Sequence, residues 1–455
     1  MIVMKFGGTS VADCAAITRT VAIVRNKLEQ KPVVVVSALS KVTDLLYKIA
    51  DSAALKNRME TSELLARLRS RHLDLAAELM PDAPDYRGQA CARINEICDR
   101  LDSFVGAVCA LGELSDRSKA VIIGTGEYLS SNVICCAMNA KGIRTGYMDA
   151  RTMIITDDEY LKGEPDSEAI QARVPGVVSA AYEGNEAVIT QGFVSATAEG
   201  EPTVLGRGGS DYSASLIGMA INATAIEIWT DVDGVRTADP RKVDNTRCIE
   251  KISFEEAAEM AHFGAKVLHP LTIEPAVNKN IPIYVLNSMN PGGKGTAILQ
   301  SDFIDDGVKS VSFKENILVI NIFSTKMINT SGFLKKVFEI FSVNKVSVDL
   351  ISTSEANISV TVDSSQKIDR VVEQLSAFAD VYVDRDKSQI SVIGKNIINL
   401  KGLLRKTFAP LSDCRIYMIS QGASYVNLSF VVDRNSLTDA VRQIHKYLFE
   451  NEGSN

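Results

Sequence analysis

The first 300 residues alternate short apolar runs with stretches of helical periodicity. The runs that we predict as strands are rich in β-branched residues and cover 33–40, 121–127, 187–195, 226–232 and 281–287. Apolar runs without polar alternation are typical of strands that are buried on both faces of a parallel sheet. The pattern therefore predicts an α/β domain with mostly parallel strands.

The segment 40–120 has a different pattern, because its residues are charged and helical in periodicity and contain no evident glycine loop. We expect it to form an elaboration beside the sheet and to take no part in a phosphate site.

Proline and glycine crowd together at 289–298, MNPGGKGTAI, and the pattern changes beyond them. We predict a first domain at 1–298 and a C-terminal region at 299–455. This region holds an internal repeat, in which 332–363 aligns without gaps on 402–433. The identical pairs include Gly332 with Gly402, Leu334 with Leu404, Phe338 with Phe408, Asn357 with Asn427 and Asp363 with Asp433. Each copy predicts a helix followed by two strands, a duplicated α+β module.

Composition limits the function classes. The chain has 455 residues, of which 46% are hydrophobic and 23% charged, with a net charge of −7. These values predict an ordinary globular protein of two or three domains and give no support to nucleic-acid binding. We found no apolar stretch of membrane-spanning length and no signal peptide, so we expect a cytoplasmic protein without a membrane partner. Eight scattered cysteines and four unclustered histidines predict reduced thiols and no protein metal site.

The stretch KFGGTSV, 5–11, ends an apolar run with a lysine, two glycines and two hydroxyl residues. Glycines let the backbone approach a ligand closely, and we expect Thr9 and Ser10 to cap a helix that begins near Val11. A strand, a glycine loop and a helix N-terminus together favour an anion such as phosphate, to which Lys5 would add charge. A plain strand-to-helix turn is the alternative.

Further stretches combine glycine with charged or hydroxyl groups. LGRGGSDYSA, 205–214, places Arg207 beside two glycines, which suggests an anionic partner such as a carboxylate, although a tight helix start would look the same. TGEYLSS, 125–131, is expected to place Glu127 at the head of a helix after a strand. Its GTG lacks the third glycine of a dinucleotide fingerprint. The loop 230–241 suits a base and ribose, and FGAKVLHP, 263–270, brings a second lysine, Lys266.

Four motifs, KFGGTSV, LGRGGSDYSA, WTDVDGVRTADPR and FGAKVLHP, in this order and followed by the repeats, resemble the aspartokinase family, and the segment from Gly332 resembles its monofunctional, lysine-sensitive branch. The resemblance covers essentially the whole chain. It implies an amino acid kinase fold with helices on both faces of the sheet, followed by two ACT modules of ferredoxin-like α+β type at about 315–385 and 386–455. A strand from 308–313 is expected to join the second module. The implied reaction transfers the γ-phosphoryl group of ATP, with Mg²⁺, to the side-chain carboxylate of L-aspartate and gives 4-phospho-L-aspartate.

The resemblance also implies roles for individual residues. Catalysis is expected from Lys5, Asp211 and Lys266. Substrate binding is expected from Thr43, Glu127, Arg207, Gly208, Gly209 and Ser210. ATP binding is expected from Lys5, Gly7, Gly8, Thr230, Asp231, Arg236, Arg241, Lys266 and Val267. Arg236 stands where many relatives carry a tyrosine near the adenine, and stacking of its guanidinium could replace that contact.

The two modules differ at positions that matter for a basic ligand. Asp349 aligns with Ile419, and Glu355 with Tyr425, so the first copy carries the carboxylates that a buried ammonium needs. By resemblance the lysine site comprises Met327, Thr330, Phe333, Leu334, Ser347, Val348, Asp349, Ser354 and Glu355. A strand-ending role for Asp349 is the alternative.

Two other functions fit part of the sequence: another amino acid kinase, acting on glutamate, acetylglutamate or a nucleotide, and a non-catalytic amino-acid sensor that retains a kinase scaffold. We expect no homoserine dehydrogenase domain, because only the short polar stretch NEGSN follows the second repeat. The resemblance also implies that the ACT modules pair across subunits and bind amino acids between them, so we expect a homodimer or a larger homo-oligomer.

Overall fold

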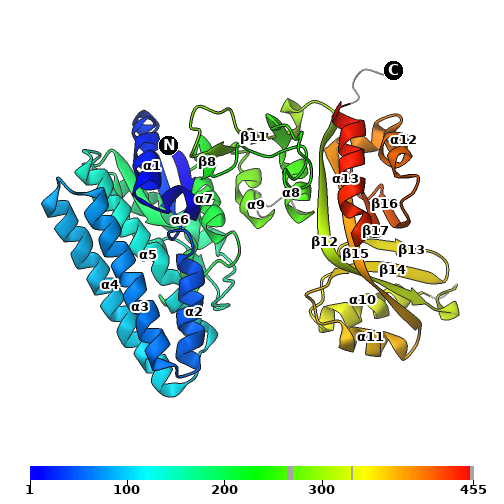
Figure 1. The fold of residues 1–455 in the computed structure, drawn as a ribbon, viewed down its shortest axis with the longest axis horizontal. Coiled ribbons are helices and arrows are strands. Elements are labelled where there is room, and N and C mark those ends of the chain that lie inside the picture. Colours follow the sequence, from blue (N-terminus) through cyan, green and yellow to red (C-terminus); the bar gives the residue numbers. More distant parts are fainter. Residues whose placement is uncertain (264–269, 329–330, 451–455) are drawn as a thin grey trace. The chain divides into compact units, whose positions relative to one another are not determined.

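The computed structural model describes residues 1–263, 270–328 and 331–450. Contacts between Cα atoms divide the chain into two compact units, Met1–Val235 with Val267–Gln300, and Arg236–Lys266 with Ser301–Asn455 (Figure 1).

The first unit is built on a mostly parallel sheet. Its strands follow the order β3-β5-β2-β1-β8-β10-β11. Their bounds are β1 Ile2–Phe6, β2 Pro32–Val36, β3 Thr145–Met148, β5 Ala187–Gln191, β8 Ala225–Thr230, β10 Ile283–Asn287 and β11 Thr296–Leu299. β1 lies between β2 and β8 and is parallel to both, and all five of its residues are buried. The predicted α/β fold with a parallel sheet is confirmed.

Helices accompany this sheet. Their bounds are α1 Cys14–Arg25, α2 Val42–Ala54, α3 Arg58–Leu79, α4 Pro84–Leu111, α5 Asp116–Ala140, α6 Ser167–Ala181, α7 Gly209–Ala220 and α9 Pro270–Asn278. α2 to α5 pack on one another as long neighbouring helices (Figure 1). The predicted helical elaboration at 40–120 is thus confirmed, although the start of α2 does contribute to the cavity described below.

One predicted strand is wrong, because 121–127 lies inside α5. A Cβ on Gly124 would lie 2.9 Å from Val194 Cγ1, and one on Gly126 would lie 2.9 Å from Ala38 Cβ. The two glycines therefore let a central helix pack closely against its neighbours. Because α5 is buried over most of its circumference, its sequence lacks the continuous polar face that marks an amphipathic helix.

By length and composition alone, α5 is long and apolar enough to cross a membrane, although no stretch of that kind was expected from the sequence. However, 72% of its most apolar window is buried inside the structure, as expected of a core helix.

Two further expectations need correction. The run 187–195 forms two strands, β5 and β6 (Val194–Thr197), and β6 pairs with β4 (Ile155–Thr156) and β7 (Pro202–Val204) in a separate sheet. The loop after β1 continues as a short 3-10 turn, Gly8–Val11, and α1 begins only at Cys14, where Asp13 accepts a hydrogen bond from the Ala16 amide at 2.8 Å. Asp13 is therefore the helix cap, not Thr9 or Ser10.

The second unit contains an antiparallel sheet with the order β13-β14-β12-β15-β17-β16. The strands are β12 Gly307–Phe323, β13 Ile351–Thr353, β14 Asn357–Asp363, β15 Asp380–Lys395, β16 Ile416–Gln421 and β17 Asn427–Asp433. The accompanying helices are α8 Phe254–His262, α10 Phe333–Val343, α11 Asp369–Ser376, α12 Leu403–Phe408 and α13 Leu437–His445. The short strand β9, Lys251–Ser253, precedes α8.

The repeat accounts for this unit. Gly332 and Gly402 have φ angles of 89° and 78° and precede α10 and α12, so the identical glycines supply a backbone conformation that other residues rarely adopt. Each helix is followed by two paired strands, β13 with β14 and β16 with β17. The predicted pair of α+β modules is confirmed.

The long strands β12 and β15 run through both modules. Residues 307–314 of β12 pair with the half of β15 that also pairs with β17, whereas 317–323 pair with β14. Each module has its own core: Val337, Val360 and Val371 lie in one, and Val311, Phe430 and Val441 in the other.

Candidate functional site

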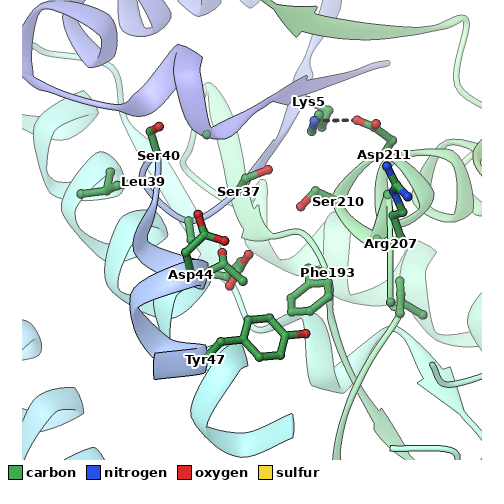
Figure 2. A pocket seen from close by; sticks show the side chains of 18 of the residues that line it. Lys5, Ser37, Leu39, Ser40, Asp44, Tyr47, Phe193, Arg207, Ser210 and Asp211 are labelled. Carbon is green, nitrogen blue, oxygen red and sulfur yellow. Dashed lines mark ion pairs between the residues drawn. The ribbon is translucent and has the colours of Figure 1, made fainter. Parts of the chain in front are cut away.

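A cavity of about 820 Å³ opens in the first unit where β1 and β2 end and α2 and α7 begin (Figure 2). Most of the expected substrate-binding and catalytic residues line this cavity, although their motifs are distant in sequence. Its lining includes Lys5, Gly8, Thr43, Glu127, Arg207, Gly208, Gly209, Ser210 and Asp211. Ligands of α/β sheets bind at the carboxyl ends of the strands, so the cavity occupies the expected edge.

Lys5 and Asp211 form an ion pair at the wall of this cavity. Lys5 Nζ lies 2.6 Å from Asp211 Oδ1, and the two side chains are 11% and 14% exposed. Lys5 belongs to the central strand β1, and Asp211 to the first turn of α7. Figure 2 shows the pair on one side of the cavity, near Ser210. The carboxylate therefore holds the ammonium in a fixed position on a rigid strand.

The glycine loop brings backbone close to backbone. The Gly7 amide donates to the Trp229 carbonyl at 3.1 Å, and the Ser40 amide donates to the Gly8 carbonyl at 3.1 Å. A Cβ on Gly8 would lie 3.0 Å from the Ala38 carbonyl oxygen. A larger residue at position 8 would therefore push apart the loops that follow β1 and β2, both of which line the cavity.

Glu127 is the buried acidic group of the cavity. Burial raises the pKa of its carboxyl to about 8, although a hydrogen bond with the Ala38 backbone acts in the opposite direction. Its Oε2 atom has no hydrogen-bond partner among the described residues. A buried carboxylate without a partner is costly, so this atom marks a position where a ligand cation would be stabilised.

The start of α7 presents amides and a positive charge to the same cavity. Gly208 has a φ angle of 74° and precedes the helix, and a Cβ on Gly209 would lie 2.7 Å from Phe193 Cδ2. Arg207 is exposed, and its guanidinium has no hydrogen bond or ion pair with any residue that the structure describes. A helix N-terminus beside a free arginine is suited to an anionic ligand.

Sequence reasoning missed several residues of the lining. They are Lys162 and five residues that Figure 2 labels, namely Ser37, Ser40, Asp44, Tyr47 and Phe193. Ser37 and Ser40 directly follow β2, so the rule that sites form at strand ends could have found them. Tyr47 lies one helical turn after Thr43 and could have been found by its spacing. Lys162 lies in a turn that carries no motif, and nothing in the sequence indicated it.

Of the residues expected to hold the nucleotide, Lys5 and Gly8 line the cavity, and Gly7 lies next to them in the glycine loop. Thr230 ends β8 next to Trp229, whose carbonyl accepts from the glycine loop, and its hydroxyl donates to Asp231 at 3.2 Å. Arg236 and Arg241 belong to the second unit.

In that unit, Arg236 donates to the Thr246 hydroxyl and carbonyl, and Arg241 pairs with Asp239. Lys266 and Val267 lie outside the described residues.

The expected lysine-site residues lie in the first ACT module, except that Thr330 is outside the described residues. Phe333 is buried in the module core, where Met327 and Val348 pack against it. Ser347 exchanges backbone hydrogen bonds with the Gln366 side chain. The others are exposed apart from Asp349, and they are Leu334, Ser354 and Glu355.

Asp349 differs from its neighbours in the expected site, because its side chain is 6% exposed and accepts a hydrogen bond from Lys314 Nζ at 2.6 Å. Within 1–263, 270–328 and 331–450, no group of three or more His, Cys, Asp or Glu residues is arranged to hold a metal ion.

Comparison with known proteins gives consistent matches. A family model described as the amino acid kinase family matches residues 1–287, and an ACT domain model matches 320–377 and 390–448. The chain is 35% identical to Aspartokinase 3, chloroplastic, of Arabidopsis thaliana, over 99% of this chain and 82% of the relative. It is 33% identical to Lysine-sensitive aspartokinase 3 of Escherichia coli, over 99% of both chains.

Solved structures of E. coli aspartokinase III are also similar. The complex with aspartate and ADP, termed the R-state, matches with a TM-score of 0.87 at 32% identity, over 99% of this chain and 100% of that chain. The complex with lysine and aspartate, termed the T-state, matches with a TM-score of 0.80 at 32% identity, over 99% of both chains.

Proposed function

Because the chain belongs to the aspartokinase family, we propose that the cavity of the first unit binds L-aspartate and the phosphates of ATP and transfers the γ-phosphoryl group to the aspartate side chain. The product is the acyl phosphate 4-phospho-L-aspartate, an intermediate for amino-acid biosynthesis.

The unpartnered carboxylate of Glu127 is the observation that carries this proposal. An amino acid carries an ammonium and a carboxylate on one carbon, and the cavity offers a partner of opposite charge for each. Glu127 Oε2 receives the α-ammonium, and the guanidinium of Arg207 binds the α-carboxylate. Thr43 and Ser210 complete the substrate pocket. The side-chain carboxylate is then directed toward Lys5.

The chemistry requires positioning and charge neutralisation. The acceptor carboxylate is ionised at pH 7, because free aspartate has a pKa of about 4, so no general base is needed. Lys5 neutralises charge that develops on the transferring phosphoryl group, while Asp211 holds the lysine at 2.6 Å. The amides of Gly8, Gly208 and Gly209 supply further donors.

ATP brings Mg²⁺ to this site. The described residues contain no cluster of three potential metal ligands, which fits an ion held mainly by phosphate oxygens and water with at most one or two carboxylates. When bound, the ion neutralises phosphate charge. Thr230 and Asp231 lie at the same sheet edge as the glycine loop and are proposed to contact the nucleotide. Roles for Arg236, Arg241, Lys266 and Val267 remain predictions.

The rival functions fit these observations less well. Acetylglutamate has an acylated nitrogen without positive charge, so it would leave Glu127 unpaired. A sensor with an inactive kinase unit would not need the Lys5–Asp211 pair. Glutamate differs from aspartate by one methylene and must be distinguished by experiment.

We further propose that L-lysine inhibits the enzyme by binding the first ACT module at Asp349. The E. coli relative is named lysine-sensitive, and one solved structure of it contains lysine.

Residues at equivalent positions of the two repeats, Leu334 and Leu404, are 42% and 46% exposed. They provide apolar surface for pairing of ACT modules between subunits, so we propose a homodimer or larger homo-oligomer. We propose a cytoplasmic location for this chain, whereas two similar proteins of Arabidopsis thaliana are named chloroplastic.

Hydroxylamine trapping tests the activity directly. The protein is incubated with ATP, Mg²⁺ and aspartate, glutamate or no acceptor, and the acyl phosphate is measured as its hydroxamate together with ADP release. We expect hydroxamate with aspartate alone. ADP release that is equal with and without aspartate would contradict the proposed reaction, and preference for glutamate would identify the rival kinase.

A further inference from the structure

The carboxylate that is proposed to bind the effector already holds a cation of this chain. Lys314 Nζ lies 2.6 Å from Asp349 Oδ2, and the two side chains are 21% and 6% exposed. His262 Nε2 lies 3.6 Å from the other oxygen, Asp349 Oδ1. A further ammonium would meet a carboxylate that is already neutralised and would be repelled by Lys314. Ligand ammonium and Lys314 must therefore compete for Asp349.

The backbone positions Lys314 between two carboxylates. The register of β12 against β15 shifts between Lys314 and Ile317, and Asn316 within this irregularity has a φ angle of 57°. Such bulges redirect side chains. Here the Lys314 ammonium lies 2.6 Å from Asp349 and 3.8 Å from Asp363 Oδ2, at the end of β14.

Asp363 is charged and able to accept the ammonium. Burial works to raise the pKa of its carboxyl, but hydrogen bonds from Ser365 and the positive charge of Lys314 outweigh burial and lower that pKa. Asp363 is therefore ionised at neutral pH. Its carboxylate lies close enough for the Lys314 ammonium to reach it by movement of the side chain alone.

In the second ACT module, the aspartate at the position equivalent to Asp363 pairs with a lysine side chain of the protein. Asp433 is the counterpart of Asp363, and Lys387 Nζ lies 2.7 Å from its Oδ1 atom. Tyr417 also donates to this carboxylate at 3.0 Å. The second module has Ile419 where the first has Asp349, so its lysine has one carboxylate where Lys314 has two. An aspartate at this position thus holds a lysine by itself when no second carboxylate competes.

We propose that Lys314 is a tethered cation that neutralises Asp349 in the absence of effector and moves to Asp363 when the ammonium of a basic effector takes Asp349. This exchange rests on the proposed binding of lysine at Asp349. It keeps every carboxylate paired in both states, and it makes the Lys314–Asp349 pair a determinant of effector affinity.

The test measures L-lysine binding by calorimetry, and inhibition by initial rates, on the full chain. Lys314→Met removes the competitor, so lysine should bind about tenfold more tightly, equivalent to 1.4 kcal/mol. Asp363→Asn removes the alternative partner of Lys314, so binding should weaken by about threefold or more. In the double variant the loss of Asp363 should have no effect on binding, because no lysine remains to be relocated.

Two further variants serve as controls. Lys387→Met removes the lysine that pairs with Asp433 in the second module and should change the affinity for L-lysine by less than about twofold. Lys314→Arg keeps the charge and should not tighten binding, which separates competition from a change in folding. Catalytic turnover without lysine should be unchanged in all of these variants.

Other outcomes of these measurements would overturn either the exchange alone or the lysine-sensing function as well. If wild type binds lysine and Lys314→Met binds it equally or more weakly, the exchange is wrong while lysine sensing stands. If neither protein binds lysine, the proposed sensing function is wrong and the exchange falls with it. Loss of affinity in Asp363→Asn that persists in the double variant would also overturn the exchange, because Asp363 would then contact the ligand itself.

Discussion

Replacement of Glu127 by glutamine should stabilise the protein and impair its function. Burial raises the pKa of this carboxyl from 4.5 to about 8, and Oε2 has no partner among the described residues. The folded protein therefore retains a proton that the unfolded chain releases above pH 4.5. A group with a raised pKa contributes stability that is fully present below the unfolded value and is lost as the pH rises through the folded value.

The magnitude follows from the two pKa values. Each pH unit between them weakens the fold by about 1.36 kcal/mol, so wild type loses about 3 kcal/mol from pH 4.5 to pH 7 through this group. Glutamine cannot ionise and loses nothing by this route. The free energy of unfolding of Glu127→Gln, minus that of wild type, should thus rise by about 3 kcal/mol over the same interval.

Urea unfolding at a series of pH values measures this difference in the free energy of unfolding. Aspartate binding measures how far the substitution impairs function. The ammonium of aspartate favours ionised Glu127, so wild-type affinity should increase with pH toward 8 and the variant should bind weakly without that trend. Glu256→Gln is the matched control, because burial also raises the pKa of Glu256, which belongs to the capping box of α8 and does not line the cavity. A stability difference that does not change with pH would refute the reasoning.

Three other substitutions test the proposed phosphate site, the aspartate site and the lysine site. Lys5→Met should lower kcat by about 10² or more. The control Lys27→Met removes the 2.8 Å pair with Glu227 outside the cavity and should not lower kcat. Near-normal turnover of Lys5→Met would contradict the phosphate site. Arg207→Ala should weaken aspartate binding by roughly 1.5 to 3 kcal/mol, the range for hydrogen bonds to charged groups, and ATP binding much less, as measured by KM or calorimetry; equal losses would indicate a folding defect. Asp349→Ala should abolish or greatly weaken inhibition by lysine with kcat nearly unchanged, and unchanged inhibition would place the lysine site elsewhere.

The sequence determined the features that are encoded locally or by repetition. The glycine loop after β1 and the glycine-flanked Arg207 could be read because each is a contiguous segment with a backbone requirement. The α/β alternation followed from the apolar runs, and the module pair followed from an ungapped repeat whose aligned glycines share a positive φ. The difference between Asp349 and Ile419 needed only the alignment of the two copies.

The tertiary structure decided where side chains from separate elements meet. Glu127 was expected at a helix head, but it lies inside a helix that is buried over most of its surface and carries no periodic polar face. Lys162 reaches the cavity from a turn without a motif, and Lys314 reaches Asp349 because of an irregularity in a strand. The burial that raises the pKa of Glu127, and the ion pair that neutralises Asp349, depend on neighbours distant in sequence. No local pattern specifies such neighbours, because dehydration and charge pairing arise only when the chain has packed.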